Sequence, residues 1–309
     1  MMSVRQSSAA AGWRAGEARL GWWLTLPAIA TIGLIALVPI LWTLWESVHL
    51  HDLRMPWLGR PFIGLDNYAE ALRTPRFLEA VGHTAIFTIV TVTLELTAGL
   101  VLALVLNRIV RGRGLVRTAV LLPGAVPTVV GALVWRFMFE SPAGVVNGVL
   151  VSTGLTATPP TWFADPIAAW VPLCLADVWK TTPFVAVVLL AGLQGIDRSL
   201  YESAQVDGAS AWQQFIGITL PLLRPALFAA CLFRILDAFR VFDVVYVMTG
   251  GGPGTATEPI ALYTFISLLQ NLRFGYGSAL SFIVFLVTLA CALACLRWLA
   301  GDTLQDRAS

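Results

Sequence analysis

The sequence contains few charged residues. Asp, Glu, Lys and Arg make up 12% of its 309 residues, whereas hydrophobic residues make up 57%. A water-soluble domain holds roughly twice that share of charged residues, because its surface faces water. The hydrophobic residues recur in long runs along the whole chain, which excludes a single soluble core. The composition therefore predicts an all-α polytopic membrane protein.

Lysine, histidine and cysteine are also scarce. Lys180 is the single lysine, and there are three histidines and four cysteines. The net charge of +2 gives no reason to expect nucleic acid as a partner. The cysteines lie in apolar segments, which is typical of small buried hydrophobic residues rather than of disulfides or metal ligands, and the pair Cys291 and Cys295 has no acid or histidine beside it. We expect no catalytic residue and no metal site. The cysteines are Cys174, Cys231, Cys291 and Cys295.

Six segments are long and apolar enough to cross a bilayer, which takes roughly 20 helical residues. Most of the arginines lie on one side of the predicted spans, and such a side is normally the cytoplasmic one. Both termini are therefore expected in the cytoplasm. The predicted organisation is a cytoplasmic tail (1–21), a transmembrane domain (22–299) and a second cytoplasmic tail (300–309). The expected spans are Trp22–Glu46, Val81–Leu106, Val116–Phe139, Ile167–Leu193, Ala226–Met248 and Gly277–Leu299.

The connection after the fourth span, residues 194–225, differs from the others because it has the pattern of folded structure. Asp197 or Ser199 is placed to cap a short helix. Glu202 follows Ser199 by three residues, which is the spacing of a capping box. The connection therefore predicts a helical element on the cytoplasmic side.

A glycine divides this connection into two parts. Gly208 permits the left-handed conformation that ends a helix. The second part, Trp212–Leu220, is amphipathic, and Pro221 and Pro225 are expected to stop it before the fifth span. Two short helices joined at a glycine form a rigid lever under the membrane.

At these positions the sequence resembles the permease subunits of binding-protein-dependent ABC importers. Those permeases carry a cytoplasmic "EAA" loop with the pattern Glu-Ala-Ala, then Gly, then Ile-x-Leu-Pro. The matching segments are Glu202-Ser203-Ala204, Asp207-Gly208-Ala209 and Ile218-Thr219-Leu220-Pro221, with Ser203 in place of the middle alanine.

Two further segments, Phe62–Tyr68 and Phe239–Pro253, resemble the carbohydrate-uptake branch of that family, the maltose, trehalose and glycerol-phosphate type. Within this branch the chain is most similar to the trehalose-importer permeases of mycobacteria. The resemblance implies a type I importer permease in the bacterial inner (cytoplasmic) membrane, in which six transmembrane helices form half of the pathway for a sugar such as trehalose. It assigns coupling to the ATPase to Glu202, Ser203, Ala204, Asp207, Gly208 and Ala209.

The same resemblance implies several partners. They are a second homologous permease subunit, two ATP-binding cassette subunits, an extracytoplasmic sugar-binding (lipo)protein and membrane lipid. ATP and Mg²⁺ would belong to the ATPase subunits, so this chain is expected to bind no cofactor. The glycine-rich run Thr249–Gly254 agrees, because it lacks a phosphate-loop lysine. This run and the segment Glu140–Pro166 are expected to meet the binding protein.

Several ionisable residues lie inside predicted spans, where charge is costly and usually faces a cavity or a partner. The spacing of three residues predicts helix-internal pairs of Arg234 with Asp237 and of Arg240 with Asp243. A structural role for these charges, between helices or against the second subunit, remains open. The intramembrane ionisable residues are Glu95, Arg136, Asp177, Lys180, Arg234, Asp237, Arg240 and Asp243. The substrate-path candidates are Asp177, Lys180, Arg240, Asp243 and Tyr246.

Two other classes of membrane protein stay open. A membrane-embedded glycan or lipid transferase would need a cluster of acids, histidines or metal ligands at one membrane face, and the sequence offers none. A secondary transporter would show an internal repeat with broken helices near the midplane. It would give no reason for an EAA loop.

Overall fold

The computed structural model describes the backbone of residues 3–108 and 112–305. Side chains are described for residues 20–108, 112, 114–116, 118–294 and 297. The side chains of Cys295 and of most residues in the two expected tails therefore lie outside the described part. Within the described part, five helices are long and apolar enough to cross a membrane, or six when one bent pair counts as a span. The prediction of an all-helical membrane protein is confirmed.

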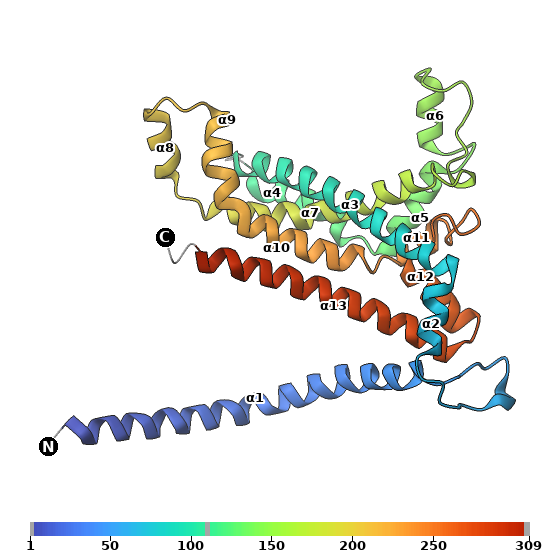
Figure 1. The fold of residues 1–309 in the computed structure, drawn as a ribbon. Coiled ribbons are helices and arrows are strands. Elements are labelled where there is room, and N and C mark those ends of the chain that lie inside the picture. The colour runs from blue at the N-terminus through green and yellow to red at the C-terminus, as the bar shows by residue number, and fades with distance from the viewer. Residues whose placement is uncertain (1–2, 109–111, 306–309) are drawn as a thin grey trace.

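Four long helices form a bundle, and a fifth stands apart from it (Figure 1). In the bundle, α7 and α10 pack against α3 and against each other, and α13 packs against α10. The fifth helix, α1, meets α13, but its apolar window is not buried by any described residue. The long helices are α1 (Ser3–Ser47), α3 (Pro75–Arg108), α7 (Trp170–Gln194), α10 (Leu220–Ala238) and α13 (Phe274–Gln305).

The expected third span, Val116–Phe139, is two helices rather than one. Helix α4 (Arg113–Ala125) and helix α5 (Thr128–Phe139) meet at an angle of 88°. The break falls at Pro127, which has no N–H to donate and disfavours helical backbone in the residue before it. Val126 is accordingly extended, with ψ of 128°.

The fifth span begins earlier than expected and is divided. Pro221 and Pro225 do not stop the preceding helix, because a π-helical segment (Phe215–Thr219) joins α9 (Ala211–Gln214) to α10. Local π geometry is one way in which membrane helices accommodate the missing proline N–H. The expected span Ala226–Met248 then breaks after Ala238 and resumes as the short helix α11 (Asp243–Met248).

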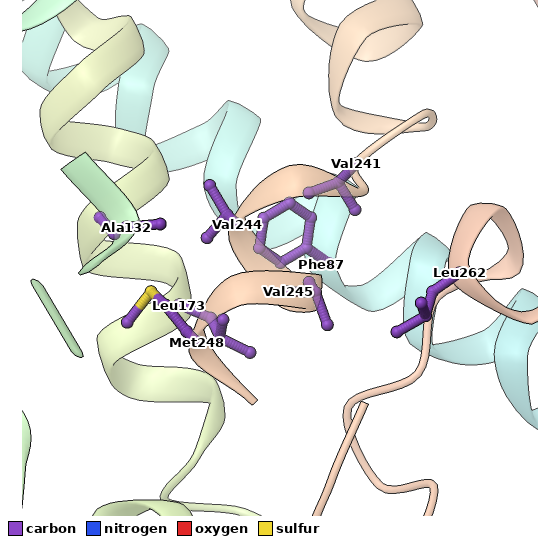
Figure 2. Packing of buried hydrophobic residues seen from close by; sticks show 9 residues of the cluster. Phe87, Ala132, Leu173, Val241, Val244, Val245, Met248 and Leu262 are labelled. Atoms are coloured by element: carbon purple, nitrogen blue, oxygen red, sulfur yellow. The ribbon is translucent and has the colours of Figure 1, made fainter. Parts of the chain in front are cut away.

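The short helix α11 is part of the core. Val244, Val245 and Met248 are buried against Phe87 of α3 and Leu173 of α7 (Figure 2). The break in the fifth span therefore returns the chain to the bundle instead of leaving it exposed.

Short elements gather at the two ends of the bundle (Figure 1). Helices α8 (Arg198–Val206) and α9 form a hairpin at one end, which we call the hairpin end. We call the opposite end the far end. The short elements of the far end are Pro56–Leu58, α2 (Asp66–Arg73), α6 (Val145–Ser152), Trp162–Ala164, α12 (Ile260–Phe265) and the π-helical segment Ile266–Gln270.

Candidate functional site

The first helix of the hairpin is capped by Asp197. Its carboxylate accepts the backbone N–H of Ser199 over 2.9 Å, which satisfies one of the free donors at the start of α8. This N–H also holds the pKa of Asp197 below its usual range. The predicted capping box between Ser199 and Glu202 is wrong, because Asp197 occupies the cap position and Ser199 already lies in the first helical turn.

The turn between the two helices depends on Gly208, as the sequence predicts. Its φ is +78°, a backbone conformation that residues with a Cβ rarely adopt. The N–H of Gly208 donates to the carbonyl of Gln205 over 3.1 Å, and the N–H of Ala209 donates to the carbonyl of Ala204 over 2.9 Å. These two bonds form a Schellman motif, which closes α8 tightly.

The second helix of the hairpin has its own capping box, which the sequence analysis missed. The Ser210 hydroxyl accepts the N–H of Gln213 over 3.3 Å, and the Gln213 side chain accepts the N–H of Ser210 over 2.7 Å. The Ser-x-x-Gln spacing is the signal that identifies such a box. Gln214 also donates to the carbonyl of Ala209 over 2.9 Å. Both hairpin helices are thus fixed at their starts, and the hairpin is a stiff element.

The six predicted coupling residues lie together on this hairpin. Ala204 and Ala209 are half-buried, and the other four are exposed. No ion-pair partner for Glu202 or Asp207 exists among the described residues, so their carboxylates are free to accept hydrogen bonds from another molecule. An open cavity of about 1110 Å³ separates the hairpin from the ends of α3 and α7. Its lining includes Asn107, Arg108, Gln194, Arg198, Glu202 and Trp212.

The intramembrane charges converge on Arg234 of α10. Its guanidinium binds Glu95 of α3 through two bonds of 2.5 and 2.9 Å, and Asp177 of α7 over 3.2 Å. The predicted pair with Asp237 is confirmed at 2.5 Å. Glu95 is completely buried and also accepts the Thr181 hydroxyl over 2.6 Å. Sequence analysis left Glu95 without a partner, although a lone acid in an apolar helix demands one.

The remaining substrate-path candidates are spread around the breaks in the third and fifth spans. Lys180 of α7 donates to the hydroxyl of Thr128, at the start of α5. The predicted pair of Arg240 with Asp243 is wrong, because Arg240 donates to the carbonyl of Leu236 over 3.3 Å instead. Its side chain turns back along α10, because the chain breaks before Asp243.

Tyr246, the aromatic candidate, lies in a group of rings. It stacks on Phe242 with a centroid separation of 5.3 Å and meets the edge of Phe265 at 5.6 Å. Trp135 and Trp179 form a second aromatic pair at 6.0 Å. Phe242, Phe265 and Trp135 were not predicted, because only the fold brings these helices together. Of the five candidates only Asp177 joins the Arg234 network.

A helical membrane domain with a stiff, capped hairpin at one end is suited to a transport subunit that is moved from that end. Among the described residues there is no group of histidines, cysteines and acids that could hold a metal ion.

Comparison with known proteins identifies the transport subunit more closely. A family model described as the binding-protein-dependent transport system inner membrane component matches residues 95–301. The trehalose/maltose transport system permease protein MalF of Thermococcus litoralis is 42% identical over 91% of this chain and 94% of its own length. The trehalose transport system permease protein SugA of Mycobacterium tuberculosis is 38% identical over 92% of each chain.

The solved structures agree on the fold. The crystal structure of a bacterial ABC transporter involved in the import of the acidic polysaccharide alginate superposes with a TM-score of 0.79. The alignment covers 93% of this chain and 97% of that one at 24% identity.

The chain belongs to the family of binding-protein-dependent transport system inner membrane components. It is therefore a multi-pass inner membrane protein and a permease subunit rather than an enzyme, and ATP is handled by partner ATPase subunits. The sequence-based resemblance to carbohydrate importer permeases is confirmed.

Proposed function

We propose that this chain forms one half of the translocation pathway of an ATP-driven sugar importer and receives force through the hairpin of α8 and α9. The observation that carries the proposal is the continuous helix from Ala211 to Ala238, which joins the hairpin to the bundle without a flexible link. A displacement imposed on the hairpin therefore reaches the membrane. In this proposal the hairpin end lies in the cytoplasm with both termini, and the far end faces outward.

A trehalose- or maltose-type disaccharide is the proposed substrate, because two relatives that match nearly the whole chain are named for trehalose or maltose transport. Lys180, Arg240, Asp243 and Tyr246 are proposed to line its path. Charged and aromatic side chains are suited to the hydroxyls and ring faces of a sugar. Asp177 is proposed to support the wall of the path, since Arg234 already occupies its carboxylate.

A second permease subunit is proposed to cover α1. An 18-residue apolar window within Leu20–Ser47 of this helix has no residue buried by the described chain, and the exposed side chains of the helix include Trp22 and Trp42. A single chain also offers only one wall of a pathway. The homologous subunit would supply the opposite wall, and lipid would cover the rest of α1.

The extracytoplasmic binding protein is proposed to contact the segment between α5 and α7, Glu140–Pro166, which we call the excursion. Helix α6 projects from the far end of the bundle (Figure 1). Asn147 fixes the excursion by bonding to the carbonyls of Glu140 and Pro160 and to the indole of Trp162. A structural relative of this chain was solved in complex with an alginate pentasaccharide-bound periplasmic protein. The glycine-rich run Thr249–Gly254 is proposed to share this contact through its exposed residues Gly250 and Gly254, whereas Gly251 is buried.

The test is reconstitution of the complete transporter in proteoliposomes, with uptake of labelled trehalose, maltose and an amino acid as the non-sugar control. We expect uptake of a disaccharide that requires ATP, the ATPase subunits and the binding protein. Sugar uptake by this chain alone, or transport of the amino acid in preference to every sugar, would contradict the proposal.

A further inference from the structure

Arg234 joins three helices at one point inside the bundle. Its side chain is 3% exposed, and its guanidinium makes four hydrogen bonds to carboxylates. Glu95 belongs to α3, Asp177 to α7, and Asp237 to α10 itself. The bond to Glu95 is bidentate, with both carboxylate oxygens engaged. A planar guanidinium held in this way has a fixed position and a fixed orientation.

The network lies far from the hairpin. At 1.5 Å per residue, Arg234 is about 20 Å along α10 from Leu220, and the path back through the π-helical segment to Ala211 of α9 is at most about 35 Å. A displacement of the hairpin reaches the network along the axis of α10, and it also reaches α7 directly through the short link Gly195–Asp197. The contacts at Arg234 add a polar connection between α10 and its neighbours α3 and α7, beside the apolar packing of the three helices.

Apolar packing alone is poorly suited to that task. Inside a bilayer there is little hydrophobic driving force between helices, because lipid tails are as apolar as leucine. Directional hydrogen bonds behave differently, since an axial slide of one residue would separate donor and acceptor by about 1.5 Å. The network specifies one axial register of α10 against its two neighbours.

We propose that Glu95, Asp177 and Arg234 form a register clamp that makes α3, α7 and α10 move as one unit when the hairpin is displaced. The three side chains are positioning residues, since they act through the helices and do not need to touch the sugar. This inference rests on the proposed function, because it assigns the clamp to the coupling of ATP hydrolysis with sugar movement.

The central test removes the three buried members of the network together instead of one partner, and it keeps Asp237, whose side chain is 65% exposed. Removing one charge leaves the others buried and unpaired, whereas replacing a complete buried network with apolar residues of similar size is often tolerated. The variant is therefore Glu95→Met, Asp177→Leu and Arg234→Met together, in the reconstituted transporter. Arg234→Lys keeps the charge without the planar fork and serves as the conservative variant. Glu70→Gln, which breaks the more exposed pair with Arg273 at the far end, is the matched control.

The measured quantity is the number of ATP molecules hydrolysed per sugar imported, together with complex yield and thermal unfolding. We expect the triple variant to assemble and to unfold near the wild-type temperature. Its ratio of ATP to sugar should rise by roughly 2- to 30-fold, the range expected when residues that couple two sites are altered. Arg234→Lys should fall between wild type and the triple variant, and Glu70→Gln should match wild type.

Two results would overturn the register clamp. One is an assembled triple variant with a wild-type ratio of ATP to sugar. The other is failure of the triple variant and of Arg234→Lys to assemble, which would assign the network to assembly alone. Failure of the proposed function gives a different result, because the wild-type transporter itself would then import no sugar.

Discussion

Replacing Gly208 by alanine isolates the backbone geometry of the hairpin from its contacts. A Cβ added at Gly208 would meet nothing within 4 Å, so the substitution causes no clash. The φ of +78° remains, and an L-residue with a side chain pays for that conformation in free energy. The penalty is about 1–2 kcal/mol, which changes the ratio of intact to rearranged turn by roughly 5- to 30-fold. We expect α8 to lose the Schellman bonds and the hairpin to become mobile.

A second glycine provides the matched control. Gly217 lies in the π-helical segment after α9, also has open space around its Cβ position, and has no positive φ. Alanine at Gly217 should therefore leave the hairpin intact, and it should stabilise the segment by up to about 1 kcal/mol because alanine favours helix. Asparagine at Gly208 should give an intermediate effect, since asparagine tolerates the left-handed conformation better than alanine.

The assay is amide hydrogen exchange over residues 198–214 in the assembled transporter, with ATP hydrolysis and sugar uptake measured on the same samples. Gly208→Ala should speed exchange in α8 and raise the ATP used per sugar, whereas Gly217→Ala should do neither. Equal exchange and equal uptake in the two variants would refute the argument that the turn geometry makes the hairpin stiff.

Three further perturbations test other parts of the structure. Asp197→Ala should fray α8 at a cost of about 1 kcal/mol while Asp197→Asn keeps the cap, as helicity measurements would show. Because the N–H of Ser199 holds the pKa of Asp197 below its usual range, the stabilisation by the cap is complete at neutral pH and is lost as the pH falls through that lowered pKa. Gly99→Ala should destabilise the bundle by about 1–3 kcal/mol in thermal unfolding, because the added Cβ would lie 2.5 Å from the side chain of Val185. Adding Val185→Ala to this variant should restore part of the lost stability. Asn147→Ala should leave the carbonyls of Glu140 and Pro160 and the indole N–H of Trp162 without their partner, and it should speed proteolysis of residues 141–164. Asn147→Asp should have a smaller effect. Unchanged proteolysis would argue against a rigid excursion.

The sequence was sufficient for the class of fold and for the hairpin. Apolar runs of about 20 residues can hardly be anything other than spans, and the residue pattern around Gly208 predicted a left-handed turn that is present. The bends could not be located from sequence. Pro127 breaks the third span and Pro221 does not break the fifth, although both are prolines in apolar surroundings. At Pro221 a π-helical segment precedes the proline and the helix continues, whereas at Pro127 the chain turns by 88°.

Charge pairing shows the same limit. The spacing of Arg234 and Asp237 was enough to predict their bond, because both lie on one continuous helix. The same spacing failed for Arg240 and Asp243, because the helix between them is broken. Arg234 and Glu95 are 139 residues apart in the chain, and their pairing depends on how α3 and α10 pack. Long-range pairs of this kind need the tertiary structure.

The unbroken helix from Ala211 to Ala238 also sets the scale of motion that the protein needs. With Arg234 as a fulcrum, the arm to the hairpin is at most about 35 Å long, because the path turns between α9 and α10 (Figure 1), so a tilt of roughly 10° carries the hairpin through up to about 6 Å. Because the helical path from Arg234 to the hairpin has no non-helical break, a small rotation of α10 about Arg234 displaces the hairpin by several ångströms. In the reverse direction, moving the hairpin by a few ångströms suffices to rotate the bundle. The angle is large enough to open or close a gap between the two proposed permease subunits.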